Sequence, residues 1–333
     1  MRWTPPFLAW QLRGAVPPRL LRGGERKNMS RLDLKFTFQC NNRCVFCVQG
    51  DKREHVEDKT GDELRAELQA YASSCDAVVF TGGEVTLRED LVEMIRHARD
   101  LGYRSIQVQT NGRRMSYAPF VDELIEAGVT EFAPALHGAN AATHDRLVRA
   151  KGAFKQTVKG IVQARKRGAR VVLNSVILQQ NYRQLPDMAR LFVKLGVPQA
   201  QFAFVHAVGS AGTHFRHVVP RYSAVMPMLR KALLIGEQAG MRMMTEAVPY
   251  CLLRGLERFC AEAIMPATAI VDGDMRIENY EQYRFDQGKL RGPTCSTCTW
   301  KARCEGPWRE YPEHFGWEEF EPRTDTAALT ASA

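Results

Sequence analysis

Short apolar or β-branched runs alternate with longer segments of helical period along this chain, starting at residue 34. This alternation predicts β-strands joined by α-helices, so that the strands run parallel and the crossovers are right-handed. The expected strands are Leu34–Gln39, Ala77–Thr81, Ser105–Gln109, Glu131–Leu136, Arg170–Leu178 and Gln201–Val205. The expected helices are Asp62–Ser73, Arg88–Leu101, Pro119–Ala127, Phe154–Arg167 and Gln184–Leu195.

Glycine directly follows several of these helical segments, at Gly102, Gly128, Gly168 and Gly196. Glycine is favoured there because a helix commonly ends on a residue with left-handed backbone angles. The strand runs are mostly apolar, which predicts strands that are buried on both faces. The expected fold class is therefore α/β, with a parallel sheet that is either open or curled into a barrel. In both architectures ligands bind at the carboxyl ends of the strands.

The composition of the 333 residues is that of a globular protein, with 45% hydrophobic and 25% charged residues. No window approaches the roughly 18 apolar residues that a membrane-spanning helix needs, so we expect no membrane partner. The net charge is +9, but residues 1–28 hold six basic residues and one acidic residue. The rest is only mildly basic, so nucleic acid is not an expected partner.

The sequence pattern changes after Val208, and we place a domain boundary near residue 215. Residues 1–30 are expected to be a basic, poorly ordered extension; a transit peptide, or translation from Met29, are the alternatives. Residues 31–215 form the predicted barrel, and 216–325 a smaller domain with a helix over Ser223–Gln238. That domain also contains a hairpin in AIVDGDMRIE, turning at Asp272-Gly273. Residues 326–333 are expected to be a disordered tail.

Six of the nine cysteines fall into two tight groups: Cys40, Cys44 and Cys47, then Cys295, Cys298 and Cys304. An odd count in a long chain argues against a disulfide framework, and tight groups predict metal ligation in a reducing compartment, here the cytoplasm. Three thiolates on one loop can hold three irons of a [4Fe–4S] cubane and leave the fourth iron open. A zinc site would need another local ligand, and the nearest histidine is His55.

The residues around the first group, QCNNRCVFC, resemble the radical S-adenosylmethionine (SAM) superfamily, whose pattern is CxxxCxΦC with an aromatic residue, here Phe46, before the last cysteine. Gly82-Gly83-Glu84 after the second strand resembles the family's GGE element. Further similar segments follow the third strand (Gln109–Gly112) and the fourth (Ala135–Gly138). The resemblance covers about residues 34–209 and implies a partial (β/α)6 TIM-like barrel.

The resemblance also implies the residues that contact the cofactor. Cys40, Cys44 and Cys47 would be the catalytic cluster ligands. Gly82, Gly83 and Glu84 would hold the amino group of SAM, because glycines let backbone carbonyls approach a ligand and a carboxylate can pair with an ammonium group. The remaining implied contacts are Phe46, Thr110, Arg149 and Asn174. Two residues depart from the family: Ala135 stands where Ser is frequent, and His137 where Asp is frequent.

The second cysteine group resembles a shortened form of the family's auxiliary-cluster domains, known as SPASM and Twitch. The resemblance implies one auxiliary [4Fe–4S] cluster on Cys251, Cys295, Cys298 and Cys304. Cys251 is preferred to Cys260 because it precedes the hairpin, as the first ligand does in those domains. Cys260 and Cys75 are expected to be small buried residues. A structural zinc ribbon is the alternative, since four thiolates serve zinc equally well.

The resemblance implies an enzyme that cleaves SAM reductively to a 5′-deoxyadenosyl radical, which abstracts hydrogen from a peptide or small metabolite. The result would be an oxidation, a crosslink or a rearrangement. The expected partners are that substrate and an electron donor such as flavodoxin or ferredoxin. Two other classes are considered: a non-enzymatic iron–sulfur electron carrier, and a zinc-containing RNA-binding module. The sequence does not identify the substrate or the oligomeric state.

Overall fold

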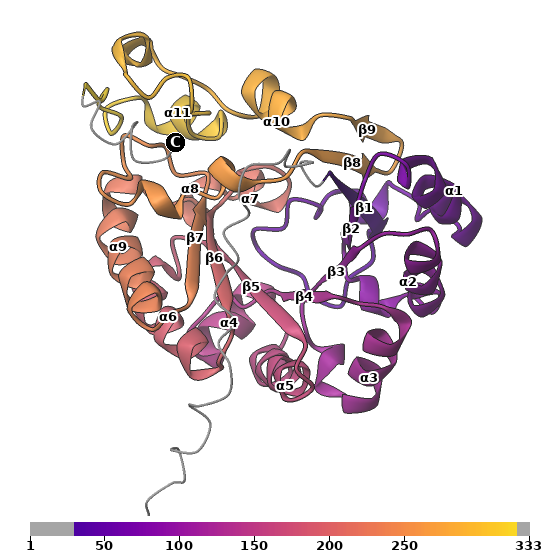
Figure 1. Ribbon diagram of the computed structural model, residues 1–333. Helices are drawn as coiled ribbons and strands as arrows, with labels where there is room; N and C mark the ends of the chain where they lie inside the picture. The colour runs from indigo at the N-terminus through magenta and orange to yellow at the C-terminus, as the bar shows by residue number, and fades with distance from the viewer. Residues whose placement is uncertain (1–29, 325–333) are drawn as a thin grey trace, which may run out of the picture.

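The computed structural model describes residues 30–324, in which nine strands form one sheet in the order β7-β6-β5-β4-β3-β2-β1-β8-β9. Strands β1 to β7 are parallel, neighbour one another in chain order, and curve around a common centre (Figure 1). The six expected strands all overlap β1 to β6, which confirms the α/β partial-barrel fold. The seven are β1 (Arg31–Thr37), β2 (Ala77–Gly82), β3 (Ser105–Thr110), β4 (Glu131–Pro134), β5 (Arg170–Ile177), β6 (Gln199–Phe204) and β7 (Arg242–Glu246).

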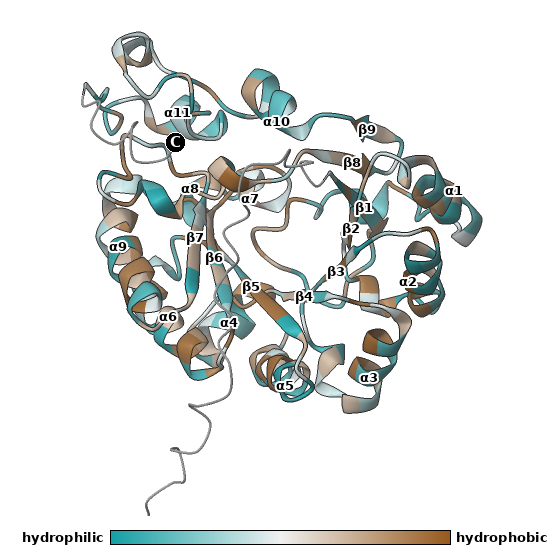
Figure 2. Ribbon diagram, viewed as in Figure 1, coloured by the Kyte–Doolittle hydropathy of each residue, from teal (hydrophilic) through white to brown (hydrophobic). Residues whose placement is uncertain are grey.

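Helices lie on the outside of the curved sheet (Figure 1), and their ribbons are partly hydrophobic and partly hydrophilic (Figure 2). The five expected helices are present, and Gly102, Gly128, Gly168 and Gly196 all have positive φ, as their predicted place beyond a helix end requires. The helices are α1 (Gly61–Tyr71), α2 (Leu91–Asp100), α3 (Ala118–Ala127), α4 (Ala141–Val148), α5 (Ala153–Lys166), α6 (Leu185–Lys194) and α9 (Tyr222–Gln238).

Strand β2 up to Thr81, and β4 after its first residue, are buried on both faces as expected, but the other four expected strands are not. In β1, β3, β5 and β6, fully buried residues alternate with partly exposed ones. The buried set includes Leu32, Val108 and Phe202, which belong to the hydrophobic core. The partly exposed set is mostly polar, as in Gln107 and Gln109. Only one face of these strands is therefore apolar, because the interior of an incomplete barrel stays accessible and accepts polar side chains.

Residues beyond 215 add to the same sheet. Strand β7 pairs with β6, and β8 (Thr268–Asp272) pairs in parallel with β1. Strand β9 (Met275–Ile277) forms the expected antiparallel hairpin with β8, but its two-residue turn is Gly273-Asp274, with Gly273 at φ +63°. The boundary near residue 215 stays a prediction; the sheet is continuous across it. The short helices here are α7 (Ser210–Thr213), α8 (Phe215–Val218), α10 (Tyr280–Tyr283) and α11 (Glu310–Phe315).

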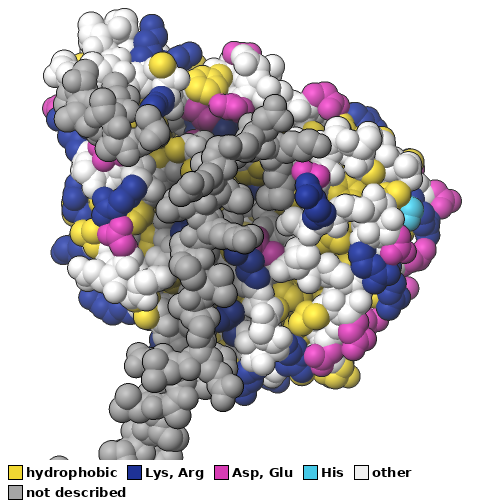
Figure 3. Space-filling model, viewed as in Figure 1, with side chains coloured by type: hydrophobic (Ala, Val, Ile, Leu, Met, Phe, Trp, Pro, Cys, Tyr) yellow, Lys and Arg dark blue, Asp and Glu magenta, His cyan; other side chains and the backbone are white. Residues whose placement is uncertain are grey.

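Two surface findings complete the fold. None of the described helices is long and apolar enough to cross a membrane. In Figure 3, Lys and Arg side chains lie at several places on this face, including its lower edge. The expected tail at 326–333, and the expected extension up to residue 29, lie outside the described residues.

Candidate active site

A cavity of about 230 Å³ lies where the carboxyl ends of β2, β3, β4 and β5 meet the loop after β1. Its walls come from strand ends that the sequence separates by whole βα units. This is the place where a parallel α/β sheet binds its ligand. The lining includes the three cysteines of the first group, Phe46, Gly82, Gly83, Thr110, Ala135, His137 and Asn174.

The cysteine loop is held in place by backbone hydrogen bonds on two sides. Arg43 N–H donates to the carbonyl of Val148 at 2.9 Å, and Val45 N–H to that of Leu147 at 3.0 Å. Ser210 N–H, after β6, donates to the carbonyl of Cys47 at 3.0 Å. The loop is therefore fixed by α4 on one side and by the segment after β6 on the other, before any cofactor contributes.

The three thiols are partly buried and unpaired by disulfides. Burial raises the pKa of the Cys44 thiol, and the neighbouring Cys47 and Cys40 raise it further. Arg53 opposes this, because its charge lowers the pKa of Cys44 and its Nη2 donates to Cys47 Sγ at 3.5 Å. A thiol whose pKa is raised by burial and by two neighbouring sulfur atoms is in a site that favours a cation, because a cation stabilises thiolates.

The donor set fits an iron–sulfur cluster better than a single ion. Within residues 30–324, no three His, Cys, Asp or Glu side chains are arranged closely enough to hold one metal ion. A [4Fe–4S] cubane needs a wider spacing between the thiolate sulfur atoms, because each thiolate binds a different iron. The cavity lining contains no fourth cysteine, which leaves one iron corner for a ligand from outside the chain.

Gly82 and Gly83 let the end of β2 approach the beginning of the cysteine loop. A β-carbon on Gly82 would lie 2.3 Å from the Thr37 carbonyl oxygen, and one on Gly83 would lie 2.2 Å from that of Gln39. Two backbone hydrogen bonds form at this close approach. Gly83 N–H donates to Thr37 O at 2.6 Å, and Glu84 N–H donates to Gln39 O at 2.7 Å. Both glycines are thus required sterically, and both line the cavity.

The Glu84 carboxylate is bound by residues of this chain, and its expected pairing with the amino group of a ligand stays a prediction. Glu84 is fully buried and does not belong to the cavity lining. Its oxygens accept hydrogen bonds from the hydroxyls of Thr110 at 2.5 Å and Thr86 at 2.6 Å, and from the N–H groups of Asn111 and Thr86. Burial raises the pKa of Glu84, while these bonds lower it. Glu84 therefore ties the ends of β2 and β3 together.

Asn174 and Phe46 line the cavity as expected, and Thr110 does so while donating to Glu84. Asn174 Oδ1 is buried and has no hydrogen-bond partner among the described residues, which marks it as an acceptor for a ligand. Phe46 meets the ring of His137 edge-on at 4.7 Å. Arg149, in contrast, is exposed at the end of α4 and does not line the cavity.

Sequence reasoning missed several cavity residues. Arg53 lines the cavity but belongs to no recognisable motif, and Gln109 lines it although the sequence analysis gave no role to this first residue of the Gln109–Gly112 segment. His137 was noticed only as a departure from the family. Its Nδ1 accepts a hydrogen bond from Val176 N–H at 3.1 Å, so the neutral ring carries its proton on Nε2. Burial, and secondarily His144, lowers the pKa of His137 to about 3, so the ring is neutral near pH 7.

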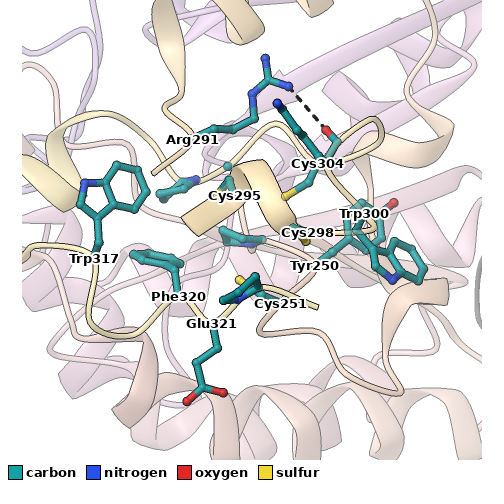
Figure 4. A pocket seen from close by; sticks show the side chains of 15 residues that line it. Tyr250, Cys251, Arg291, Cys295, Cys298, Trp300, Cys304, Trp317, Phe320 and Glu321 are labelled. Carbon is teal, nitrogen blue, oxygen red and sulfur yellow. Dashed lines mark hydrogen bonds between the residues drawn. The ribbon is translucent and has the colours of Figure 1, made fainter. Parts of the chain in front are cut away.

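A second cavity, of about 20 Å³, brings together Cys251, Cys295, Cys298 and Cys304 (Figure 4). Burial and, after it, the neighbouring Cys304, Cys295 and Cys298 together raise the pKa of Cys251 to about 12. Cys260 is not in this lining; it is buried, and its S–H donates to Glu262 at 3.4 Å. The remaining walls are largely apolar, with Tyr250, Trp300, Trp317 and Phe320.

Comparison with known proteins agrees with this geometry. Residues 34–192 match the family model described as the Radical SAM superfamily. A probable GTP 3′,8-cyclase of Saccharolobus islandicus is 30% identical over 187 residues, which are 56% of this chain and 60% of that relative. The Fe-coproporphyrin III synthase of Methanosarcina barkeri is 30% identical over 174 residues, 52% of this chain and 42% of that relative. The chain thus matches 60% or less of the length of these curated relatives.

Two groups of solved structures share the fold. Streptococcus suis SuiB bound to S-adenosylmethionine superposes with a TM-score of 0.62 at 14% identity, covering 89% of this chain and 77% of SuiB. The anSMEcpe structure with bound AdoMet and Cp18Cys peptide has a TM-score of 0.62 at 16% identity, covering 88% of this chain and 92% of that one. At these identities the likeness concerns the fold alone.

Proposed function

Because this chain belongs to the radical SAM superfamily, we propose that it cleaves SAM reductively at a [4Fe–4S] cluster held by Cys40, Cys44 and Cys47. Bound there, the cluster and SAM supply a 5′-deoxyadenosyl radical that takes hydrogen from a small-molecule or peptide substrate. The observation that carries the proposal is that the three cysteines share one cavity wall with Gly82, Gly83 and Asn174.

The chain's own residues would bind and orient SAM in this cavity. Gly82 and Gly83 bring backbone groups to the cavity surface, where a side chain would block the approach. Asn174 Oδ1 is a free acceptor, and the Nε2–H of His137 is a donor with no acceptor among residues 30–324. Phe46 and Val176 supply apolar surface that keeps water away from the reacting atoms.

We further propose an auxiliary [4Fe–4S] cluster on Cys251, Cys295, Cys298 and Cys304. Their shared cavity, apart from Cys260, supports Cys251 as the fourth ligand. Such a cluster would accept an electron from the substrate, bind the substrate, or hold the C-terminal region together. Free thiols throughout the chain suit the reducing cytoplasm, which stays the proposed location.

The substrate class is proposed only as a small molecule or a peptide. Relatives in sequence include a probable GTP 3′,8-cyclase and an Fe-coproporphyrin III synthase, which act on small molecules. Neighbours in structure include SuiB bound to its precursor peptide SuiA. An electron donor such as flavodoxin or ferredoxin is the other proposed partner.

The test is reductive SAM cleavage by anaerobically reconstituted protein with dithionite, followed as 5′-deoxyadenosine by mass spectrometry. We expect cleavage by the wild type and none above background from Cys44→Ala. Cys75→Ala is the matched control, because Cys75 is buried beside α1 and lines neither cavity. It should retain both iron and cleavage.

Other outcomes would favour the competing classes. Iron and sulfide without any SAM cleavage, and an EPR spectrum that SAM does not perturb, would indicate a simple electron carrier. Zinc without iron or sulfide in anaerobically purified protein would indicate the zinc-containing RNA-binding module. Either result overturns the proposal.

A further inference from the structure

A basic patch covers the surface formed by α4, α5 and the cysteine loop. Residues 145–167 contain eight basic residues and one acidic residue, Asp145. The Asp145 carboxylate is already engaged, because it accepts hydrogen bonds from Gly152 N–H at 2.6 Å and Phe154 N–H at 2.7 Å. We define the basic patch as Arg43, Arg146, Arg149, Lys151, Lys155 and Lys159, all of which are exposed.

The charges of the basic patch are not balanced within the fold. No residue of the patch forms a salt bridge with any residue between 30 and 324. By contrast, Arg167, at the end of α5, pairs with Asp122 at 2.5 Å. Lys155 and Lys159 are one helical turn apart, a like-charge spacing that destabilises a helix. Within the fold, Arg43 Nη1 donates to the carbonyls of Cys40 and Asn42, and Arg146 lies in the last turn of α4. No carboxylate among residues 30–324 pairs with the four other charges of the patch, which are therefore available to a negatively charged partner.

The basic patch adjoins the first cysteine group. Arg43 and Val45, on either side of Cys44, form backbone hydrogen bonds with Val148 and Leu147 in the last turn of α4. Lys151 follows three residues after Val148. A partner on this surface is therefore next to the loop that carries Cys44, and Arg43 itself belongs to both.

We propose that the basic patch is the docking surface for an acidic one-electron donor protein of the flavodoxin or ferredoxin class. The inference rests on the proposed function, because reductive SAM cleavage consumes one electron per event. In the docked step the donor is oxidised by one electron and the cluster is reduced by one electron; no bond forms or breaks. Positive charge around the entry point would raise the encounter rate with an acidic donor.

Nucleic acid is the other polyanion that a basic surface attracts. The patch favours a protein donor because it adjoins the cysteine loop, where an electron would be delivered. Binding of nucleic acid there would place a phosphate backbone against the cluster loop without supplying an electron. We therefore treat nucleic-acid binding as an outcome of the test.

The test measures cluster reduction by flavodoxin hydroquinone in a stopped-flow instrument, using the reconstituted holoprotein at several salt concentrations. The variant is Lys151→Glu/Lys155→Glu, which leaves Arg149 and all cavity residues unchanged. The control is Lys194→Glu/Lys231→Glu, which changes the net charge equally at exposed positions on α6 and α9. We expect the bimolecular rate constant to fall about tenfold or more in the first variant at low salt, with a weaker salt dependence, and little in the control.

SAM cleavage with dithionite, which needs no donor protein, tests the proposed function separately from the docking surface. If both variants cleave SAM with dithionite as the wild type does, the proposed function stands independently of docking. Equal rate constants for both variants with flavodoxin would then overturn the docking surface. So would a first variant that loses affinity for single-stranded RNA while its reduction by flavodoxin is unchanged. If wild type with dithionite fails to cleave SAM, the proposed function itself fails.

Discussion

Gly83 shows how one missing side chain can position a cofactor loop. Its α-carbon lies against the backbone of Phe38 and Gln39, so that the loop carrying Cys40 starts in direct contact with the end of β2. The two N–H groups that follow, of Gly83 and Glu84, bond to this loop. Because the neighbouring atoms are backbone, they cannot rotate away from an added methyl group.

We therefore expect Gly83→Ala to lower the free energy of unfolding by about 1–3 kcal/mol and to reduce the iron content of the reconstituted protein. The steric conflict is with the Gln39 carbonyl at 2.2 Å. Gly61→Ala is the matched control, since its β-carbon would meet nothing nearer than 3.4 Å at the start of α1. Urea unfolding and iron assays measure both effects. Equal stability and iron content in the two variants would contradict this role of Gly83.

At the scale of elements, two histidines join β4, α4 and β5. His137 N–H donates to His144 Nδ1 at 3.1 Å, and Val176 N–H donates to His137 Nδ1 at 3.1 Å. Asn181 Nδ2 donates to the carbonyl of His137 at 2.9 Å. Both rings must therefore be neutral to accept these bonds. Burial lowers the pKa of His137 to about 3 and of His144 to about 4, although Asp145 raises the latter.

The hydrogen bonds of these two neutral histidines predict that the free energy of unfolding falls in acid. A histidine whose folded pKa is lowered binds its proton in the unfolded chain first, so stability is lost as the pH falls below about 6.5. The loss is about 1.4 kcal/mol per pH unit for each histidine, until the folded pKa is reached. His144→Asn keeps an acceptor for His137 N–H and should make the pH dependence shallower by that amount. Urea unfolding of the wild type, His144→Asn and the control His217→Asn, an exposed position, between pH 7.5 and 5 tests this prediction. If the free energy of unfolding depends on pH equally in all three proteins, the two buried histidines do not cause the acid sensitivity.

The sequence predicted elements well where a local signal marks them. Apolar runs located β1 to β6, and terminal glycines located the ends of α2, α3, α5 and α6. Helix α4 was missed because it ends at Arg149, which adopts φ +50° without being glycine. The polar interior of the barrel was missed for a different reason. Single-strand hydropathy does not reveal that alternate residues face an accessible lumen.

In the candidate site, too, the sequence predicted the residues that a local motif marks and not those whose role depends on tertiary contacts. Motif spacing located the three cysteines and the two glycines, which the cavity brings together. It could not orient Glu84, because that depends on Thr110 and Asn111 from the neighbouring strand. It could not show that Arg53 lines the cavity or that Asn174 Oδ1 is unpaired, because both facts depend on contacts between residues far apart in the sequence.

At the scale of the whole molecule, a buried ionic network connects the C-terminal region to the barrel. Arg284 binds Glu305 through two hydrogen bonds at 2.7 and 2.8 Å, and Lys289 bridges Glu305 and Glu262 at 2.8 and 2.7 Å. Glu262 also accepts from Ala247 N–H, just after β7. Since Cys304 precedes Glu305, the network lies between the barrel sheet and the second cysteine group. No local motif predicts it, because its four members come from three separate segments.

Removing one charge from this network should be costly. Burial raises the pKa of Glu305, but the Arg284 and Lys289 partners lower it overall, so Glu305 is the ionised centre of the network. Glu305→Gln leaves the buried Arg284 without its carboxylate partner and Lys289 with Glu262 alone, and breaking a buried pair costs about 3–5 kcal/mol. We expect a melting temperature lower by several degrees, faster proteolysis of the C-terminal region and less iron at the second cysteine group, while Cys40, Cys44 and Cys47 retain theirs. Glu318→Gln, at an exposed position, is the control. Iron lost equally from both groups would mean that the network stabilises the whole fold and not the attachment of this region.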